Sequence, residues 1–169
     1  MPPFKFNSAE LAGIIAYLRN MNSFDARSVT LGDADRGRVV FEGKGGCMTC
    51  HRVNGTGGWM APDLSDIGAS RTAGVPQHSL LDPSGAMLPI NRPVRAVTTD
   101  GKVINGRRLN EDTYTVQLID DQGRLASLVK ADLREYTILT KSPMPSYKDK
   151  LSSAELADVL TYLLSLKGS

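Results

Sequence analysis

The two cysteines of this 169-residue chain lie three positions apart, and a histidine directly follows the second. The stretch is Cys47-Met48-Thr49-Cys50-His51, and the other histidine, His78, is distant in the sequence. Two cysteines form at most one disulfide, so the chain has no disulfide framework. The segment is therefore a candidate for a redox pair, for part of a metal site or for the covalent attachment of a cofactor.

Covalent attachment of haem accounts for all three residues of this motif. Two thiols at this spacing match the two vinyl groups of the porphyrin, and the adjacent histidine supplies an axial ligand for the iron. A thioredoxin-like pair requires a βαβ context, which the flanking sequence does not predict. A structural zinc site requires four ligands, and only His51 and His78 are available to join the thiols. We therefore favour one haem c bound through Cys47 and Cys50 over a buried or disulfide-bonded cysteine pair.

The composition is that of an ordinary globular protein and argues against several classes of partner. Hydrophobic residues make up 41% and charged residues 22% of the chain, and the net charge is +2. Because this charge is small and no basic stripe is visible, we expect no nucleic-acid partner. No apolar stretch approaches the roughly 20 residues needed to span a bilayer, so we expect no membrane span in this chain. The first residues, MPPFKFNSAE, lack the pattern of a secretory signal.

Three stretches resemble class I c-type cytochromes, in the order in which that family has them. They are DADRGRVVFEGKGGCMTCH (33–51), GTGGWMAPDLSDIG (55–68) and SPMPSYKDKLSSAELADVLTYLLSLK (142–167). The resemblance implies a mainly α cytochrome c fold made of residues 32–82 and 141–169. Chains of this kind with an inserted small β module are familiar as haem-binding domains of bacterial proteins, some of them associated with dehydrogenases.

The first and last of these stretches predict two helices that pack together. Gly37 and Phe41 lie four positions apart, on one face of the first helix. Ser152 and Glu155 predict a capping box at the start of the last helix. In the resembled family these two helices cross near the glycine, here Gly37, which permits their close approach.

The resemblance also implies the residues around the cofactor. Cys47 and Cys50 form the thioether bonds, and His51 is the proximal ligand of the iron. The carbonyl of Pro62 accepts a hydrogen bond from the ring of His51 and fixes its orientation. The remaining assignments are Leu64 as a haem contact, with Trp59 and Arg71 at the propionates.

Met144 is the expected distal ligand, because a proline and then the last helix follow it in the order of the family. A methionine thioether is a soft, neutral ligand, and His/Met ligation raises the reduction potential. Met87 is the alternative that spacing alone leaves open. His78 is a further rival, which we interpret as a surface or boundary histidine.

Residues 83–140 are expected to form an inserted antiparallel β module. The segment 94–109 reads as two strands joined by Asp100-Gly101, a strong hairpin signal. The segment 113–129 reads as a second hairpin that turns at 121–123, and a last short strand is expected at 134–140. Five such strands indicate a small SH3-like or Sm-like barrel, or a curled sheet. We interpret the module as a lid or spacer beside the haem, with partner docking as the alternative, and its arginines as a solvated face.

Residues 1–23 are expected to form an extra amphipathic helix. They repeat the pattern of the last helix, including a capping box at Asn7 and Glu10. One interpretation is the tail of a preceding cytochrome domain. The helix would then cap this domain or form a dimer with a second chain, because an isolated amphipathic helix must cover a surface.

The sequence as a whole predicts a single-electron carrier and not an enzyme, although it is also compatible with a domain of a larger oxidoreductase. The alternatives are a peroxidase-like haem enzyme and a haem-based sensor, both with an open or labile sixth site at the iron. The expected partner is a redox protein, such as a dehydrogenase or another cytochrome domain. Since c-type attachment takes place outside the cytoplasm, we expect a periplasmic or other extracytoplasmic location, with the signal outside this chain.

Overall fold

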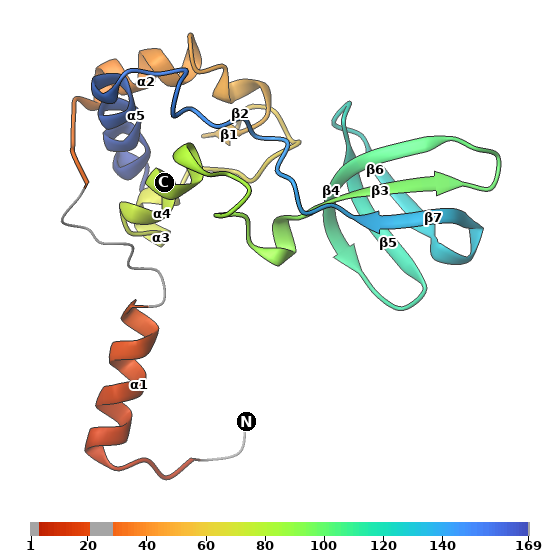
Figure 1. The fold of residues 1–169 in the computed structure, drawn as a ribbon, viewed down its shortest axis with the longest axis horizontal. Coiled ribbons are helices and arrows are strands. Elements are labelled where there is room, and N and C mark those ends of the chain that lie inside the picture. The colour runs from red at the N-terminus through yellow and green to blue at the C-terminus, as the bar shows by residue number, and fades with distance from the viewer. Residues whose placement is uncertain (1–3, 21–28, 169) are drawn as a thin grey trace.

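The computed structural model describes residues 4–20 and 29–168 (Figure 1). The helices of residues 34–81 and 153–165 form one part, called the helical part below, and the strands of residues 93–138 form a sheet. The helices are α1 (Ser8–Asn20), α2 (Ala34–Glu42), α3 (Ile67–Ser70), α4 (Gly74–Leu81) and α5 (Ser153–Ser165), with 3-10 turns η2 (Cys47–Thr49), η3 (Pro89–Asn91) and η4 (Lys130–Asp132). The strands are β1 (Arg52–Val53), β2 (Thr56–Gly57), β3 (Pro93–Thr98), β4 (Val103–Glu111), β5 (Thr115–Asp120), β6 (Leu125–Val129) and β7 (Leu133–Ile138). None of the described helices is both long enough and apolar enough to cross a membrane.

The expectation of a mainly α fold is wrong. Helices account for 35% of the structure and strands for 24%, and the strands build a five-stranded sheet. The physical reason lies in the lengths of the elements, since α3 and α4 are short while strands follow one another closely over residues 93–138. The helical elements and the sheet therefore contribute comparable shares of the fold.

Helices α2 and α5 pack against each other at Gly37. A Cβ atom at Gly37 would lie 2.0 Å from the backbone oxygen of Asp158 and 2.9 Å from Cβ of Tyr162. Only a glycine lets the two helix backbones come this close. Beside this contact the rings of Phe41 and Tyr162 lie 5.3 Å apart, a favourable tilted pair. The core of the helical part is centred here, with Phe41 and Val159 each 1% exposed.

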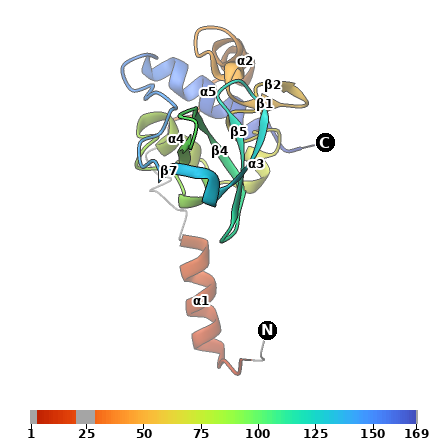
Figure 2. The same cartoon turned by 90° about the vertical axis from the view of Figure 1, so that its right-hand side faces the viewer.

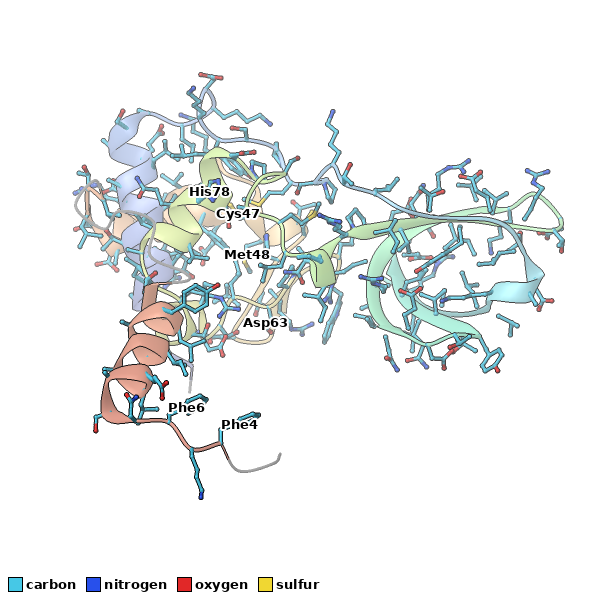
Figure 3. The ribbon with its side chains drawn as sticks, turned by 60° about the horizontal axis from the view of Figure 1, so that its bottom comes forward. Phe4, Phe6, Cys47, Met48, Asp63 and His78 are labelled. Atoms are coloured by element: carbon cyan, nitrogen blue, oxygen red, sulfur yellow. The ribbon has the colours of Figure 1, made fainter. Side chains whose placement is uncertain are left out.

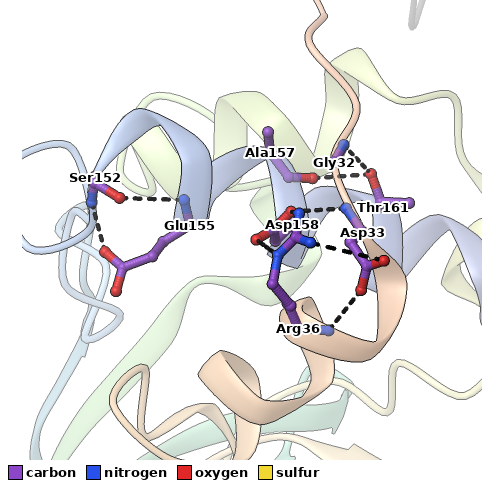
Figure 4. Close-up of polar contacts among 8 residues, drawn as sticks. All are labelled: Gly32, Asp33, Arg36, Ser152, Glu155, Ala157, Asp158 and Thr161. Carbon is purple, nitrogen blue, oxygen red and sulfur yellow. Dashed lines mark hydrogen bonds and ion pairs between the residues drawn. The ribbon is translucent and has the colours of Figure 1, made fainter.

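A buried carboxylate ties the start of α2 to α5 (Figure 4). Asp158 accepts a hydrogen bond of 2.6 Å from the backbone N–H of Asp33 and two bonds of 2.9 Å from the guanidinium of Arg36. The bond from Arg36 is the main reason why the pKa of Asp158 lies below its ordinary value. Gly32 donates to the hydroxyl of Thr161, which itself donates to the carbonyl of Ala157. The chain entering α2 is therefore fixed at two points on α5.

The capping box predicted for the last helix is confirmed. Ser152 accepts from the backbone N–H of Glu155, and the Glu155 side chain accepts from the backbone N–H of Ser152. Lys44 donates to the same carboxylate at 2.8 Å, which joins α5 to the chain just beyond α2. The bond from Lys44, with the bonds from Ser152, lowers the pKa of Glu155 to about 2.

Replacing Glu155 by glutamine is expected to flatten the acid side of the stability profile. The pKa of Glu155 falls from 4.5 to about 2 on folding, so its stabilising effect is complete above pH 4.5 and disappears as the pH falls toward 2. As the pH falls through this window, the melting temperature should therefore decrease more steeply for the wild type than for Glu155→Gln. Glu42→Gln, which removes an exposed pair with Arg38, serves as the control and should change the melting temperature little. Superimposable profiles for the wild type and Glu155→Gln would contradict this account.

The large sheet is antiparallel, with the strand order β6-β5-β4-β3-β7. The predicted hairpins form, and Gly101 and Gly123 adopt the positive φ angles of 88° and 76° that tight turns require. The strands curl around one another in Figure 1, and Figure 2 shows the same sheet from the right-hand side of that view. The sheet has a core of its own. This core consists of fully buried side chains from two strands: Val94, Ala96, Val97, Val116 and Leu118.

Helix α1 stands apart from the other elements in both views (Figures 1 and 2). Its predicted capping box is present, since Asn7 and Glu10 exchange hydrogen bonds of 2.9 Å. All described side chains from Phe4 to Leu18 are exposed, including the apolar Ile14 and Ile15. Residues 1–3 and 21–23 of the segment assigned to this helix lie outside the described residues.

Candidate cofactor site

The cysteine motif begins with a tight turn that follows α2. Gly46 adopts the left-handed conformation with φ of 62°, and the turn η2 follows it directly. The backbone N–H groups of Cys50 and His51 both donate to the carbonyl of Cys47, at 3.2 and 2.9 Å. Cys47 is buried and Cys50 is half-buried, and both are free thiols. Figure 3 shows Cys47 in the helical part of the molecule.

The hairpin of β1 and β2 holds the histidine end of this motif. A Cβ atom at Gly57, where φ is 111°, would lie 2.3 Å from the carbonyl oxygen of His51. A Cβ atom at Gly58 would lie 2.3 Å from the carbonyl oxygen of Thr49. Gly58 also donates to the carbonyl of His51 at 3.0 Å. The GTGG stretch after the motif is therefore required for the hairpin to pack directly on it.

The ring of His51 is oriented by the backbone. Its Nδ1 lies 2.8 Å from the carbonyl oxygen of Pro62. Because a carbonyl only accepts hydrogen bonds, Nδ1 must carry the proton and donate, which leaves Nε2 as the nitrogen with a free lone pair. Burial lowers the pKa of His51, and the nearby charge of Arg107 lowers it further. The site therefore favours a neutral imidazole, which is the form that binds a metal ion.

A cavity of about 780 Å³ lies against this motif, between the helical part and the sheet. This volume is within the range of cofactor and ligand sites. Residues from four separate parts of the chain line it. They are Cys47, Cys50, His51, Met60 and Pro62 from the motif and its loop; Met87 and Leu88 before the sheet; Pro93, Asn105, Gly106, Arg107 and Ile119 from the sheet; and Met144 and Tyr147 after it.

Met144 reaches this cavity from the segment between β7 and α5. Its backbone N–H donates to the hydroxyl of Ser142, and the side chain packs on the core of the helical part. Tyr147 fixes the same segment, since its hydroxyl donates to the carbonyl of Gly45 at 2.6 Å. The second candidate methionine, Met87, also lines the cavity.

The other residues assigned from the sequence lie outside the lining of this cavity. Trp59 is 54% exposed, and the guanidinium of Arg52 lies 3.7 Å from its ring centre. Arg71 is exposed and bonds to a neighbouring backbone carbonyl. Leu64 packs on the core of the helical part. His78 lies on α4, 3.8 Å from Asp82.

Arg107 is a site residue that the sequence pattern does not reveal. The arginines of the β module are expected to form a solvated face, yet the side chain of Arg107 is half-buried and lines the cavity. Its Nε is buried without a hydrogen-bond partner among the described residues. The sequence signal is weak, because two adjacent arginines point to opposite faces of a strand and nothing shows which face is covered.

These residues fit a covalently attached haem. The cavity offers two free thiols, an oriented imidazole, thioethers and mostly apolar walls. Haem also carries two carboxylate groups, and the guanidinium of Arg107, whose Nε has no hydrogen-bond partner among the described residues, is a donor of the kind that they require. The residues present therefore match the chemistry of the group.

Comparison with known proteins agrees with this chemistry. Residues 34–112 match the family model described as Cytochrome c, and this range includes the cysteine motif and Pro62. The match supports a c-type cytochrome with a covalently bound haem, and hence a role in electron transfer. No curated protein matches the chain.

Proposed function

We propose that this protein is a single-electron carrier with one haem c attached to Cys47 and Cys50 and ligated by His51 and Met144. The observation that carries the proposal is the cavity in which two free thiols, an oriented histidine and a methionine meet. The bound haem supplies an iron that alternates between the ferric and ferrous states. The residues of this chain perform every other role in the proposed mechanism.

The proximal side of the proposed site depends on Pro62. Its carbonyl oxygen accepts a hydrogen bond from the proton-bearing Nδ1 of His51 at 2.8 Å, which fixes the tautomer and the orientation of the ring. Such a hydrogen bond also increases the basicity of the ligating nitrogen. The packing of Gly57 and Gly58 on the motif limits movement of His51. A ligand held in this way changes position little when the iron changes charge, which favours rapid electron transfer.

On the distal side the proposal assigns Met144. This methionine is anchored through Ser142 and packs on the core of the helical part, whereas Met87 is not part of that packing. A neutral thioether favours the ferrous state and so raises the reduction potential. Met87 remains the competing ligand, because it lines the same cavity.

We also propose a cellular location and redox partners for this protein. Cytochrome c domains are typically extracytoplasmic, which supports a periplasmic or other extracytoplasmic location. A carrier requires a donor and an acceptor, and we assign these roles to redox proteins such as a dehydrogenase or another cytochrome domain. The apolar residues of α1, of which Ile14 is 38% exposed, are a candidate dimer surface.

Carbon monoxide separates a carrier from a haem enzyme or a sensor. A firm methionine–iron bond leaves no free position at the iron, so the ferrous wild type is expected not to bind carbon monoxide readily. The variant Met144→Ala should bind it, because alanine offers no ligand. Optical titration of both reduced proteins measures the difference. Ready binding by the wild type would contradict the carrier and favour an enzyme or sensor.

A further inference from the structure

Arg107 is one of the sheet residues that line the cavity beside the cysteine motif. It lies on β4, and its register partners are Pro93 on β3 and Ile119 on β5. All three residues line the cavity, so one end of three neighbouring strands forms part of its wall. The Nη2 atom of Arg107 donates to the carbonyl of Trp59 at 3.3 Å, which holds the guanidinium against the loop after the cysteine motif.

The donors of this guanidinium are not fully used. Its Nε is buried and has no hydrogen-bond partner among the described residues, and the side chain forms no ion pair with them. Burial lowers the pKa of Arg107, since the charged form loses hydration. A partly buried cation without an anionic partner is unfavourable, because one carbonyl acceptor does not neutralise its charge.

In the part of the chain that the structure describes, the other charged groups of the lining form no ion pair or hydrogen bond with Arg107. Asp120 accepts a hydrogen bond of 2.8 Å from Arg124 within its own hairpin, and Asp121, which also lines the cavity, is exposed to solvent. The lysines Lys44, Lys141 and Lys150 are exposed, and solvent can hydrate them. Arg107 is therefore the one cation among the described lining residues that is withdrawn from solvent.

We infer that the guanidinium of Arg107 binds a propionate group of the haem, so that the β module completes the haem site. This inference rests on the proposed function, because it requires haem in the cavity. Haem carries two propionates on the half of the ring away from the thioether bonds, and guanidinium–carboxylate pairs combine charge with directed hydrogen bonds. Arg107 acts as a positioning residue, and its hydrogen bond to the carbonyl of Trp59 orients the guanidinium. The module is then part of the site and more than a spacer.

The pair has a consequence for the reduction potential. A cation beside a propionate disfavours the more positive ferric state and offsets the negative charge of the carboxylate. Both effects raise the potential, so Arg107→Gln should lower it. Arg107→Lys should restore most of the difference, because it restores the charge. The carboxylate bands of the propionate in the infrared difference spectrum should also shift in Arg107→Gln.

The matched control is Arg108→Gln, which removes an equal charge from the adjacent position. Arg108 pairs with Glu111 and donates to the carbonyl of Pro89 at 3.0 Å, and it does not line the cavity. We expect its loss to leave the potential and the propionate bands unchanged. Circular dichroism and melting temperature of every haem-loaded variant separate a local change from unfolding.

Two outcomes would overturn the inference, and they are distinguishable. An unchanged potential with unshifted propionate bands in Arg107→Gln would overturn it and leave the proposed carrier intact. Should Arg107→Gln fail to fold, infrared spectra of the wild type with isotope-labelled propionates would decide, since bands of free, hydrated carboxylates exclude the pair. A wild type without covalent haem would overturn both proposals.

Discussion

The variant Gly37→Ala is expected to lose about 3 kcal/mol or more of its free energy of unfolding, because overpacking at a rigid contact is severely unfavourable. The added Cβ would lie 2.0 Å from the backbone oxygen and 2.4 Å from the backbone carbon of Asp158. Backbone atoms in the middle of α5 cannot move aside as a flexible side chain can. The helices must separate, which disturbs the Phe41–Tyr162 pair and the bonds of Asp158.

The matched control for this prediction is Gly13→Ala. Both glycines lie inside helices, but among the described residues no atom outside the glycine's neighbours and its own helix backbone lies within 4 Å of a Cβ at Gly13. The control should therefore be neutral, or slightly stabilising through lower chain entropy. Chemical denaturation of the haem-loaded proteins measures both differences. Equal stability of Gly37→Ala and the wild type would mean that α2 and α5 do not cross as described.

The double variant Cys47→Ala/Cys50→Ala is expected to lose covalent haem completely. Each thiol supplies one of the two thioether bonds in the proposed attachment. Alanine fills most of the space of a cysteine, so the turn η2 and its bond from His51 to Cys47 should persist. A haem stain on a denaturing gel and the intact mass give the result directly.

A variant between the two cysteines provides the control for covalent attachment. Met48→Leu changes a side chain that packs on the core but lies outside the cavity lining, and it should keep the haem. Covalent haem in the double-cysteine variant, or its absence from the wild type, would contradict attachment through this motif.

Local signals in the sequence predicted the elements whose stability is local. The capping boxes at Asn7 and Ser152 locate the starts of α1 and α5, and Asp100-Gly101 locates a hairpin, because each depends on a few neighbouring residues. Gly37 was predicted by resemblance, and the structure supplies the reason in the backbone of α5. The expectation of a mainly α fold was wrong, because α3 and α4 are short and the strands of residues 93–138 contribute a comparable share of the structure.

The features that the sequence did not predict depend on how segments far apart in the chain are placed relative to one another. Strand alternation predicts that Arg107 and Arg108 point to opposite sides, but not that one side faces the helical part. That depends on how the sheet is attached, through residues before β3 and after β7. Trp59 and Arg71 illustrate the converse, since resemblance assigned them to the propionates while the structure shows both exposed. Their assignment stays a prediction, and Arg107 is the stronger candidate on geometry.

The most direct measurement is the visible spectrum of the oxidised and reduced haem-loaded protein, for the wild type, Met144→Ala and Met87→Ala. The account predicts a low-spin spectrum with the weak far-red methionine–iron charge-transfer band in the wild type and in Met87→Ala. The band should be absent from Met144→Ala, whose iron loses its sixth ligand. A band that survives in Met144→Ala, or a high-spin wild type, would contradict His51/Met144 ligation and with it the proposed carrier.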